Sequence, residues 1–264
     1  MSKECSQPGN PAAKRALVCS GIWGGIRDAD QNVNTDGLAA SVFSSSCDGG
    51  KGGDIYYIGA CKGCKLTRMA VADVVGHGQA VSDVSEYMYD SLKAHICDPD
   101  SRKILSELNQ VASKQGLNAM TTAAVVAYSG VSDEVFLSQA GHPPILLNRK
   151  GRSSWSAVGL DGSSVEPREP NVGLPLAVAP ETVYQQQVIP ITSGDRLFVY
   201  TDGVTEAPNR LGELFGTRRL TAVLDANAGA PLPCLKSAVV EALREHTGNG
   251  LTHDDVTLIA MEVR

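Results

Sequence analysis

The order of strand-like and helix-like segments constrains the fold of this chain more than any other feature. Strand-type runs occur in three groups, and two pairs of helix-type segments separate these groups. A parallel βαβ fold would instead alternate one strand with one helix. The sequence therefore predicts an α+β fold in which antiparallel sheets are flanked by helix pairs. The strand-type runs are residues 38–46, 54–60, 65–75, 121–130, 134–141, 143–151, 183–191, 195–204 and 255–263.

The helix-type segments are recognised by apolar spacing and by residues that begin or end helices. In the first of them Val84, Met88 and Leu92 recur at helical spacing. Ser101 predicts the N-cap of the second, and Gly116 predicts its end. The four predicted helices span residues 77–96, 101–115, 216–226 and 233–247.

Two regions outside these segments are expected to be irregular. Residues 1–37 are rich in Gly, Asn, Asp and Ser, and we expect a loosely ordered lead-in there, with Trp23 as the anchor if it packs on the domain. Residues 151–173 are rich in Gly, Ser and Pro and are expected to form a surface loop. The structured domain is predicted to span residues 38–264.

Length and charge exclude several classes of protein. A chain of 264 residues with 42% hydrophobic residues can bury the core of one large domain. A formal charge of −6 disfavours nucleic acid as the main partner and makes a divalent cation more plausible. The N-terminus lacks a signal-peptide core, and no apolar run approaches the roughly 18 residues of a membrane span. We expect a cytoplasmic protein.

Seven cysteines, an odd number in a chain of this size, favour reduced thiols over a disulfide framework. Cys61 and Cys64 form the sequence CKGC. The simplest interpretation is a glycine-containing hairpin turn that carries two thiols. Half of a zinc site and a redox pair are the alternatives, although no second CxxC follows.

Aspartates stand at the ends of several strand-type runs. Asp54 begins one run, Asp73 ends its neighbour, Asp202 ends a third, and Asp254 and Asp255 open the last. Each alone could be a turn former or a helix cap. Strand ends that are distant in sequence can nevertheless converge in a packed sheet, and clustered carboxylates repel one another unless a cation lies between them. Oxygen-binding divalent cations would meet that need.

Seven motifs in a fixed order resemble the metal-dependent protein phosphatase family (type 2C), in its bacterial SpoIIE/RsbU-like branch. The resemblance extends from about Leu38 to the C-terminus. The motifs are GGD (52–54), ADVVGHG (72–78), MTTAAVVAY (120–128), AGHPP (140–144), GLPLAV (173–178), GDRLFVYTDGVTEA (194–207) and DDVTLIAMEV (254–263).

The resemblance implies a four-layer αββα sandwich with two Mn²⁺ or Mg²⁺ ions at one end. Asp54 would hold one ion and Asp73 would bridge both, with the carbonyl of Val74 as a further ligand. Asp202 and Asp254 would hold the other ion. Asp255 is the alternate ligand should the register shift by one residue. Glycines at 52, 53 and 76 are expected to leave room for the ions.

The implied activity is hydrolysis of phosphoserine or phosphothreonine in a protein, with a metal-activated water as the nucleophile. By family analogy the substrate would be a phosphorylated anti-sigma-factor antagonist of the STAS type, in a partner-switching pathway. His77 is a candidate general acid, or else a residue that caps or orients the following helix. His142 is expected to pack at a strand end, and Thr121, Thr122 and Glu206 are interpreted as structural.

Two other functions stay open from the sequence. The protein could be a catalytically silent regulator that binds a phosphoprotein, although the four proposed ligands argue against it. It could also be a thiol or zinc sensor that acts through CKGC. The chain departs from the family pattern after GGD, where Tyr56 and Tyr57 stand in place of a second acidic residue.

Overall fold

Two antiparallel sheets pack face to face in the structure, a computed structural model that describes residues 19–61, 66–98, 100–158, 164–165, 173–248 and 250–264. The first sheet has the strand order β1-β4-β5-β6-β7-β11 and the second the order β10-β9-β8-β12-β13-β3-β2. The first sheet comprises β1 (Cys19–Arg27), β4 (Lys51–Cys61), β5 (Leu66–Val74), β6 (Thr121–Ser129), β7 (Glu134–Ala140) and β11 (Gln187–Pro190). The second comprises β2 (Ala29–Asn34), β3 (Leu38–Ser45), β8 (Leu146–Asn148), β9 (Ser156–Val158), β10 (Ser164–Val165), β12 (Arg196–Tyr200) and β13 (Val256–Val263).

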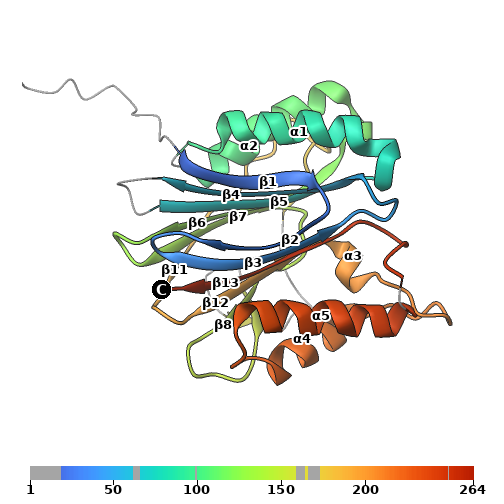
Figure 1. The fold of residues 1–264 in the computed structure, drawn as a ribbon. Coiled ribbons are helices and arrows are strands. Elements are labelled where there is room, and N and C mark those ends of the chain that lie inside the picture. The colour runs from blue at the N-terminus through green and yellow to red at the C-terminus, as the bar shows by residue number, and fades with distance from the viewer. Residues whose placement is uncertain (1–18, 62–65, 99, 159–163, 166–172, 249) are drawn as a thin grey trace, which may run out of the picture.

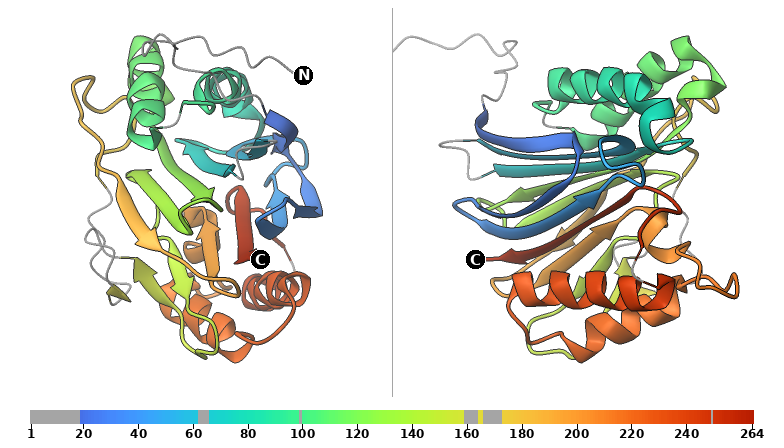
Figure 2. Two further views of the ribbon diagram at one scale, coloured as in Figure 1. Left: turned by 90° about the vertical axis from the view of Figure 1, so that its left-hand side faces the viewer. Right: turned by 45° about the vertical axis from the view of Figure 1, so that its right-hand side comes forward.

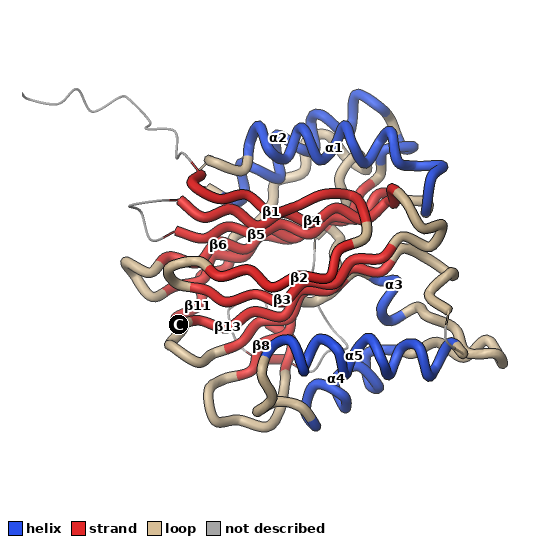
Figure 3. The backbone as a smooth tube through the Cα atoms, in the orientation of Figure 1, coloured by secondary structure: helices blue, strands red, loops and turns tan. Residues whose placement is uncertain are grey.

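Helices cover the outer face of each sheet, which gives the four layers seen in Figures 1 and 3. The first sheet is covered by α1 (Ser82–His95) and α2 (Ser101–Gln115), and the second by α4 (Gly216–Ala226) and α5 (Leu232–Thr247). The short elements are η1 (Gly78–Val81), η2 (Leu117–Ala119) and α3 (Asp202–Thr205). Figure 2 shows the same layers from two other directions. The predicted αββα sandwich is confirmed.

The core consists of three apolar layers, one between the sheets and one beneath each helix pair. Neighbouring residues of a strand point to opposite faces of a sheet, so β4 contributes to two layers at once. Ile58 faces the central layer with Ile259 of the opposite sheet. Tyr57 faces the outer layer with Leu105 of α2. The third layer joins Phe198 of β12 to α4 and α5.

The expectation of a loosely ordered lead-in is wrong for residues 19–34. β1 pairs with β4 and β2 pairs with β3, so this segment adds one strand to each sheet. Apolar packing stabilises this segment, because Val33 is buried in the central layer and Trp23 packs against that layer. The polar composition hid two edge strands, because an edge strand needs only one apolar face.

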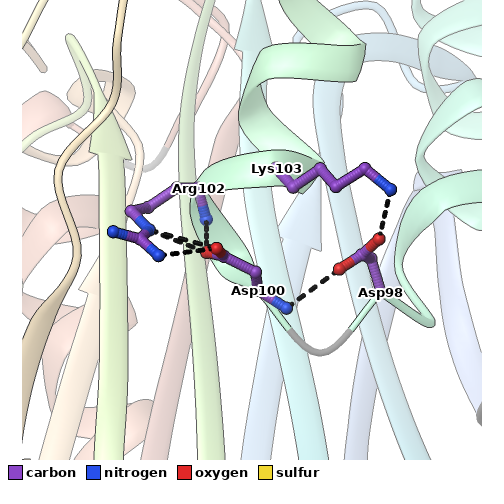
Figure 4. Close-up of polar contacts among 4 residues, drawn as sticks. All are labelled: Asp98, Asp100, Arg102 and Lys103. Atoms are coloured by element: carbon purple, nitrogen blue, oxygen red, sulfur yellow. Dashed lines mark hydrogen bonds and ion pairs between the residues drawn. The ribbon is translucent and has the colours of Figure 1, made fainter. Parts of the chain in front are cut away.

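The N-cap of α2 lies one residue before the predicted Ser101 (Figure 4). The N-cap is Asp100, whose carboxylate accepts a hydrogen bond from the backbone N–H of Arg102 at 3.0 Å. Ser101 is the first helical residue. The backbone N–H of Asp100 in turn donates to Asp98 Oδ1 at 3.0 Å, and Lys103 pairs with the other oxygen of Asp98. Gly116 ends the helix at φ +76°, as predicted.

The predicted loop at 151–173 is only partly irregular. Its described residues include the short strands β9 and β10, and Trp155 is buried against α4. Trp155 Nε1 donates to the carbonyl of Leu224 at 3.1 Å, which anchors the segment. Residues 159–163 and 166–172 lie outside the described residues.

The CKGC sequence falls between β4 and β5, which pair as the predicted hairpin. Cys61 ends β4 and is buried, whereas Cys64 lies outside the described residues. Among the helices in the described part of the chain, not one has the length and apolar content that crossing a membrane requires.

Candidate metal centre

Two of the predicted ligands come from the hairpin of β4 and β5. The antiparallel register places Asp54 directly opposite Asp73 at one end of the first sheet. Asp54 is 3% exposed and Asp73 is partly exposed. Paired positions on neighbouring antiparallel strands carry their Cβ atoms roughly 5 Å apart, so the two carboxylates share one site.

The other two predicted ligands come from the second sheet. β12 ends at Tyr200, and Asp202 opens α3 immediately after it. Asp254 lies two residues before β13, which pairs with β12. Thr201 joins the two sheets at this end, because its Oγ1 donates to Asp54 Oδ2 at 2.8 Å.

The shifted pKa values indicate that these carboxylates lie within electrostatic range of one another. Burial, and then the charges of Asp54, Asp202 and Asp254, raise the pKa of Asp73 well above its ordinary value. The pKa of Asp254 is raised as well, mainly by burial, with Asp202 and Asp255 adding to the effect. Four carboxylates from both sheets therefore meet in one region of negative potential.

Asp54 is the most deeply buried member of this group. Burial raises the pKa of its carboxyl well above the ordinary range, although hydrogen bonds from Thr201 and Thr257 act in the opposite direction. Its Oδ1 is buried with no hydrogen-bond partner among the described residues. An unpartnered buried polar atom costs about 1–3 kcal/mol, so this oxygen is suited to bind a cation.

The carboxylate side chains do not have the arrangement of a complete metal site. Within the described residues, no three His, Cys, Asp or Glu side chains are grouped so that they could hold an ion as they stand. The residues present fit a pair of hard divalent ions by donor chemistry, because all four are oxygen ligands.

Asp255, the alternate ligand, has both carboxylate oxygens occupied by backbone amides. Oδ2 accepts from the N–H groups of Gly53 (2.5 Å) and Gly78 (3.0 Å). Oδ1 accepts from the N–H of Cys47 at 2.8 Å. Asp255 is 2% exposed.

The glycines of the GGD motif make room mainly for Asp255 and the backbone, and not only for ions as expected. A Cβ at Gly52 would lie 2.7 Å from Asp255 Cγ. A Cβ at Gly53 would lie 2.9 Å from the carbonyl oxygen of Val74. The Val74 carbonyl proposed as a ligand is thus close to the residue before Asp54. Gly76 adopts φ +102°, a left-handed conformation that only glycine takes readily.

The two candidate histidines occupy different environments. His77 is exposed, and its Nδ1 lies 3.4 Å from Cys47 Sγ. Its charge lowers the pKa of Asp254 slightly, which places His77 at the rim of the carboxylate group. His142 is fully buried, with Nδ1 3.0 Å from the hydroxyl of Thr122, and burial lowers its pKa to about 3. It packs at the strand end, as predicted.

Sequence reasoning missed Thr201 and Cys47. Thr201 directly precedes the aspartate of the TDG motif, and that position was a usable signal. Cys47 follows β3 in a glycine-rich turn, and no local pattern marks it. Burial, with the nearby charges of Asp255 and Asp48, raises the pKa of the Cys47 thiol to about 12, so it stays protonated near neutral pH.

Comparison with known proteins identifies the family. Residues 65–264 match the model of stage II sporulation protein E (SpoIIE). Protein IcfG of Synechocystis sp. is 25% identical over 236 residues, which are 86% of this chain and 34% of IcfG, so the chain spans about a third of that relative.

Solved structures agree on the fold. The RsbU and RsbW domains of Rv1364c from Mycobacterium tuberculosis align with a TM-score of 0.70 at 26% identity, over 91% of this chain and 62% of that one. The SiaA-PP2C domain of Pseudomonas aeruginosa aligns with a TM-score of 0.69 at 20% identity, over 84% of this chain and 85% of that one. With three quarters of its residues matched by the family model, the chain belongs to the SpoIIE family, the RsbU-like branch of the PP2C-type protein phosphatases.

Proposed function

We propose that this protein is a metal-dependent phosphatase that hydrolyses phosphoserine or phosphothreonine in a protein substrate. The observation that carries the proposal is the meeting of four carboxylates from both sheets, together with a buried oxygen of Asp54 that has no hydrogen-bond partner in the described part of the chain. This arrangement has an electrostatic cost that bound cations would remove.

Each carboxylate has a separate role in holding two Mn²⁺ or Mg²⁺ ions. Thr201 engages Oδ2 of Asp54, so Oδ1 is the oxygen left for an ion. Asp73, whose pKa responds to acids of both sheets, is proposed to lie between the two ions. Asp202 and Asp254 would hold the second ion, and the carbonyl of Val74 would be a further ligand of the first. When bound, two divalent cations make an attacking water more acidic and offset charge on the phosphoryl oxygens.

His77 is the candidate proton donor. It stands exposed at the rim of the site, where solvent and a protein substrate both have access. A serine alkoxide is a poor leaving group, so a proton supplied as the P–O bond breaks would speed the reaction.

The substrate we propose is a phosphorylated antagonist of the STAS type in a partner-switching pathway. The neighbour from Mycobacterium tuberculosis carries an RsbU domain together with an RsbW domain, which supports a signalling role of this kind. The cytoplasm is the proposed location, because an odd number of cysteines favours a reducing compartment. No specific observation favours the silent regulator, and the thiol-sensor alternative depends on Cys64, outside the described residues.

The decisive test is metal-dependent turnover of p-nitrophenyl phosphate and of a phosphoserine peptide. We expect EDTA to abolish activity and Mn²⁺ to restore it. Asp73→Asn and Asp202→Asn should each lower kcat by several orders of magnitude, because each loses a charged ligand. Asp90→Asn, on the exposed face of α1, is the matched control and should keep full activity. Activity that is indifferent to EDTA, or a two-fold effect of Asp73→Asn, would contradict the proposal.

A further inference from the structure

Asp255 is bonded to three segments of the chain that lie far from it in sequence. Its carboxylate accepts hydrogen bonds from three backbone N–H groups. These belong to Cys47 in the turn after β3, Gly53 in β4 and Gly78 at the start of η1. These residues are 208, 202 and 177 positions away, respectively. Few side chains can satisfy three amide donors at once, and an ionised carboxylate can do so because it only accepts hydrogen bonds.

The backbone of Asp255 contacts a fourth segment. A Cβ at Gly203 would lie 2.0 Å from the carbonyl oxygen of Asp255, so only glycine fits there without a shift of the backbone. Gly203 directly follows Asp202 in α3. The start of α3 is therefore packed against the start of β13.

Each proposed ligand is thus linked to Asp255 through a residue close to that ligand in the sequence. Gly53 precedes Asp54, Gly78 closes the turn that follows Asp73, Gly203 follows Asp202, and Asp254 is the residue before Asp255. We propose that Asp255 is a positioning residue: it sets the separation of the four metal-binding segments and binds no metal itself. This inference rests on the proposed function, since it presumes that the four carboxylates bind cations.

If Asp255 has a positioning role, its replacement should weaken metal binding and leave the number of metal ligands unchanged. Replacing the carboxylate by an amide turns one acceptor into an N–H₂ group that faces backbone donors, so the segments must move apart. Loss of a group that orients metal ligands typically weakens metal binding 10–100-fold.

The test is direct Mn²⁺ binding to the full chain, measured by isothermal titration calorimetry. For Asp255→Asn we expect the wild-type number of ions and a dissociation constant raised about 10-fold or more. Asp254→Asn, which removes a proposed ligand, should instead bind fewer ions. Thermal unfolding in EDTA checks that both variants are folded.

Two glycine variants provide a second test if Asp255→Asn does not fold. Gly52→Ala retains the carboxylate but places a methyl group 2.7 Å from Asp255 Cγ, and it should weaken Mn²⁺ binding in the same direction. Gly229→Ala has no heavy atom within 4 Å of the new Cβ and should bind as wild type.

Three results would overturn the inference, and they are distinguishable. If Asp255→Asn binds Mn²⁺ as tightly as wild type, Asp255 does not position the site. If it loses an ion as Asp254→Asn does, Asp255 is itself a ligand. If wild-type protein binds no Mn²⁺, the proposed function fails and this inference falls with it.

Discussion

At the scale of single residues, environment separates the two histidines of the family motifs more clearly than sequence does. His142 has a pKa of about 3 because it is fully buried, so it is a neutral imidazole at physiological pH. In that state the imidazole is hydrogen-bonded to Thr122, and burial keeps it away from solvent. His77 is exposed beside Cys47 and near Asp254. Of these two, His77 is the one whose ring is open to solvent, as the proposed proton donor must be.

A proton-donor role for His77 is testable through the leaving group. For a phosphoserine peptide, His77→Gln should lower kcat about 10²-fold or more, because the serine alkoxide needs a proton. For p-nitrophenyl phosphate the effect should be small, since p-nitrophenolate leaves unaided. Steady-state kinetics on both substrates measure the difference, with His246→Gln on α5 as control. Equal losses on both substrates would argue that His77 acts on the structure of the site.

At the scale of elements, one loop is fixed to α2 by a single buried side chain. Asn109 is fully buried and accepts from the N–H of Ala177 at 2.9 Å. Its amide donates to the carbonyls of Ala179 and Pro180 at 2.9 and 3.1 Å. Ala177 adopts φ +68°, a conformation that costs a non-glycine residue about 1–2 kcal/mol. Asn109 offsets that cost and holds the loop beside the start of β6, where Leu176 pairs with Thr121.

Removal of this side chain should destabilise the domain without touching the carboxylates. Asn109→Ala leaves buried polar groups unpaired, and we expect the free energy of unfolding to fall by about 2–4 kcal/mol. Gln110→Ala, exposed on the same helix, should change it by less than about 0.5 kcal/mol. Urea denaturation monitored by circular dichroism compares the two, and equal midpoints would show that the loop has no need of Asn109.

The elements themselves were largely predictable because their periodicity is local. The boundaries of α4 and of the β4–β5 hairpin follow from apolar spacing and glycine positions. β1 and β2 escaped prediction because their pairing with β4 and β3 is a tertiary event in a polar segment. The convergence of the carboxylates was predicted from their places at strand ends and from motif order, whereas the proposed role of Asp255 depends on donors far along the chain that no local pattern connects.

At the scale of the whole molecule, the candidate site lies at the seam between the two sheets. Asp54 and Asp73 belong to the first sheet, whereas Asp202 and Asp254 belong to segments of the second. The carboxylates of the two sheets repel one another across the seam, whereas a bound cation would be attracted by the carboxylates of both sheets. If the site binds cations as proposed, metal supply and domain stability are coupled.

This coupling predicts a metal-dependent response of stability to pH. The folded-state pKa values of Asp54, Asp73 and Asp254 are raised, so protonation favours the folded state. In EDTA, their contribution is fully present below the ordinary aspartate pKa of about 4 and is lost as pH rises through the raised values. The Tm in EDTA should fall between pH 5 and 8, and excess Mn²⁺ should raise it most at the upper end. Parallel curves with and without Mn²⁺ would contradict this account.

The seam also has a consequence during protein synthesis. A ribosome has already made three quarters of the domain before it reaches Asp202, and it must continue to Asp254 before the fourth carboxylate exists. A nascent chain whose first sheet is complete would carry two of the four acids and five of the seven strands of the second sheet, but neither β12 nor β13, beside which the other two acids lie. The four acids can therefore come together only after β12 and β13 have joined the second sheet, so the proposed activity requires a completed chain.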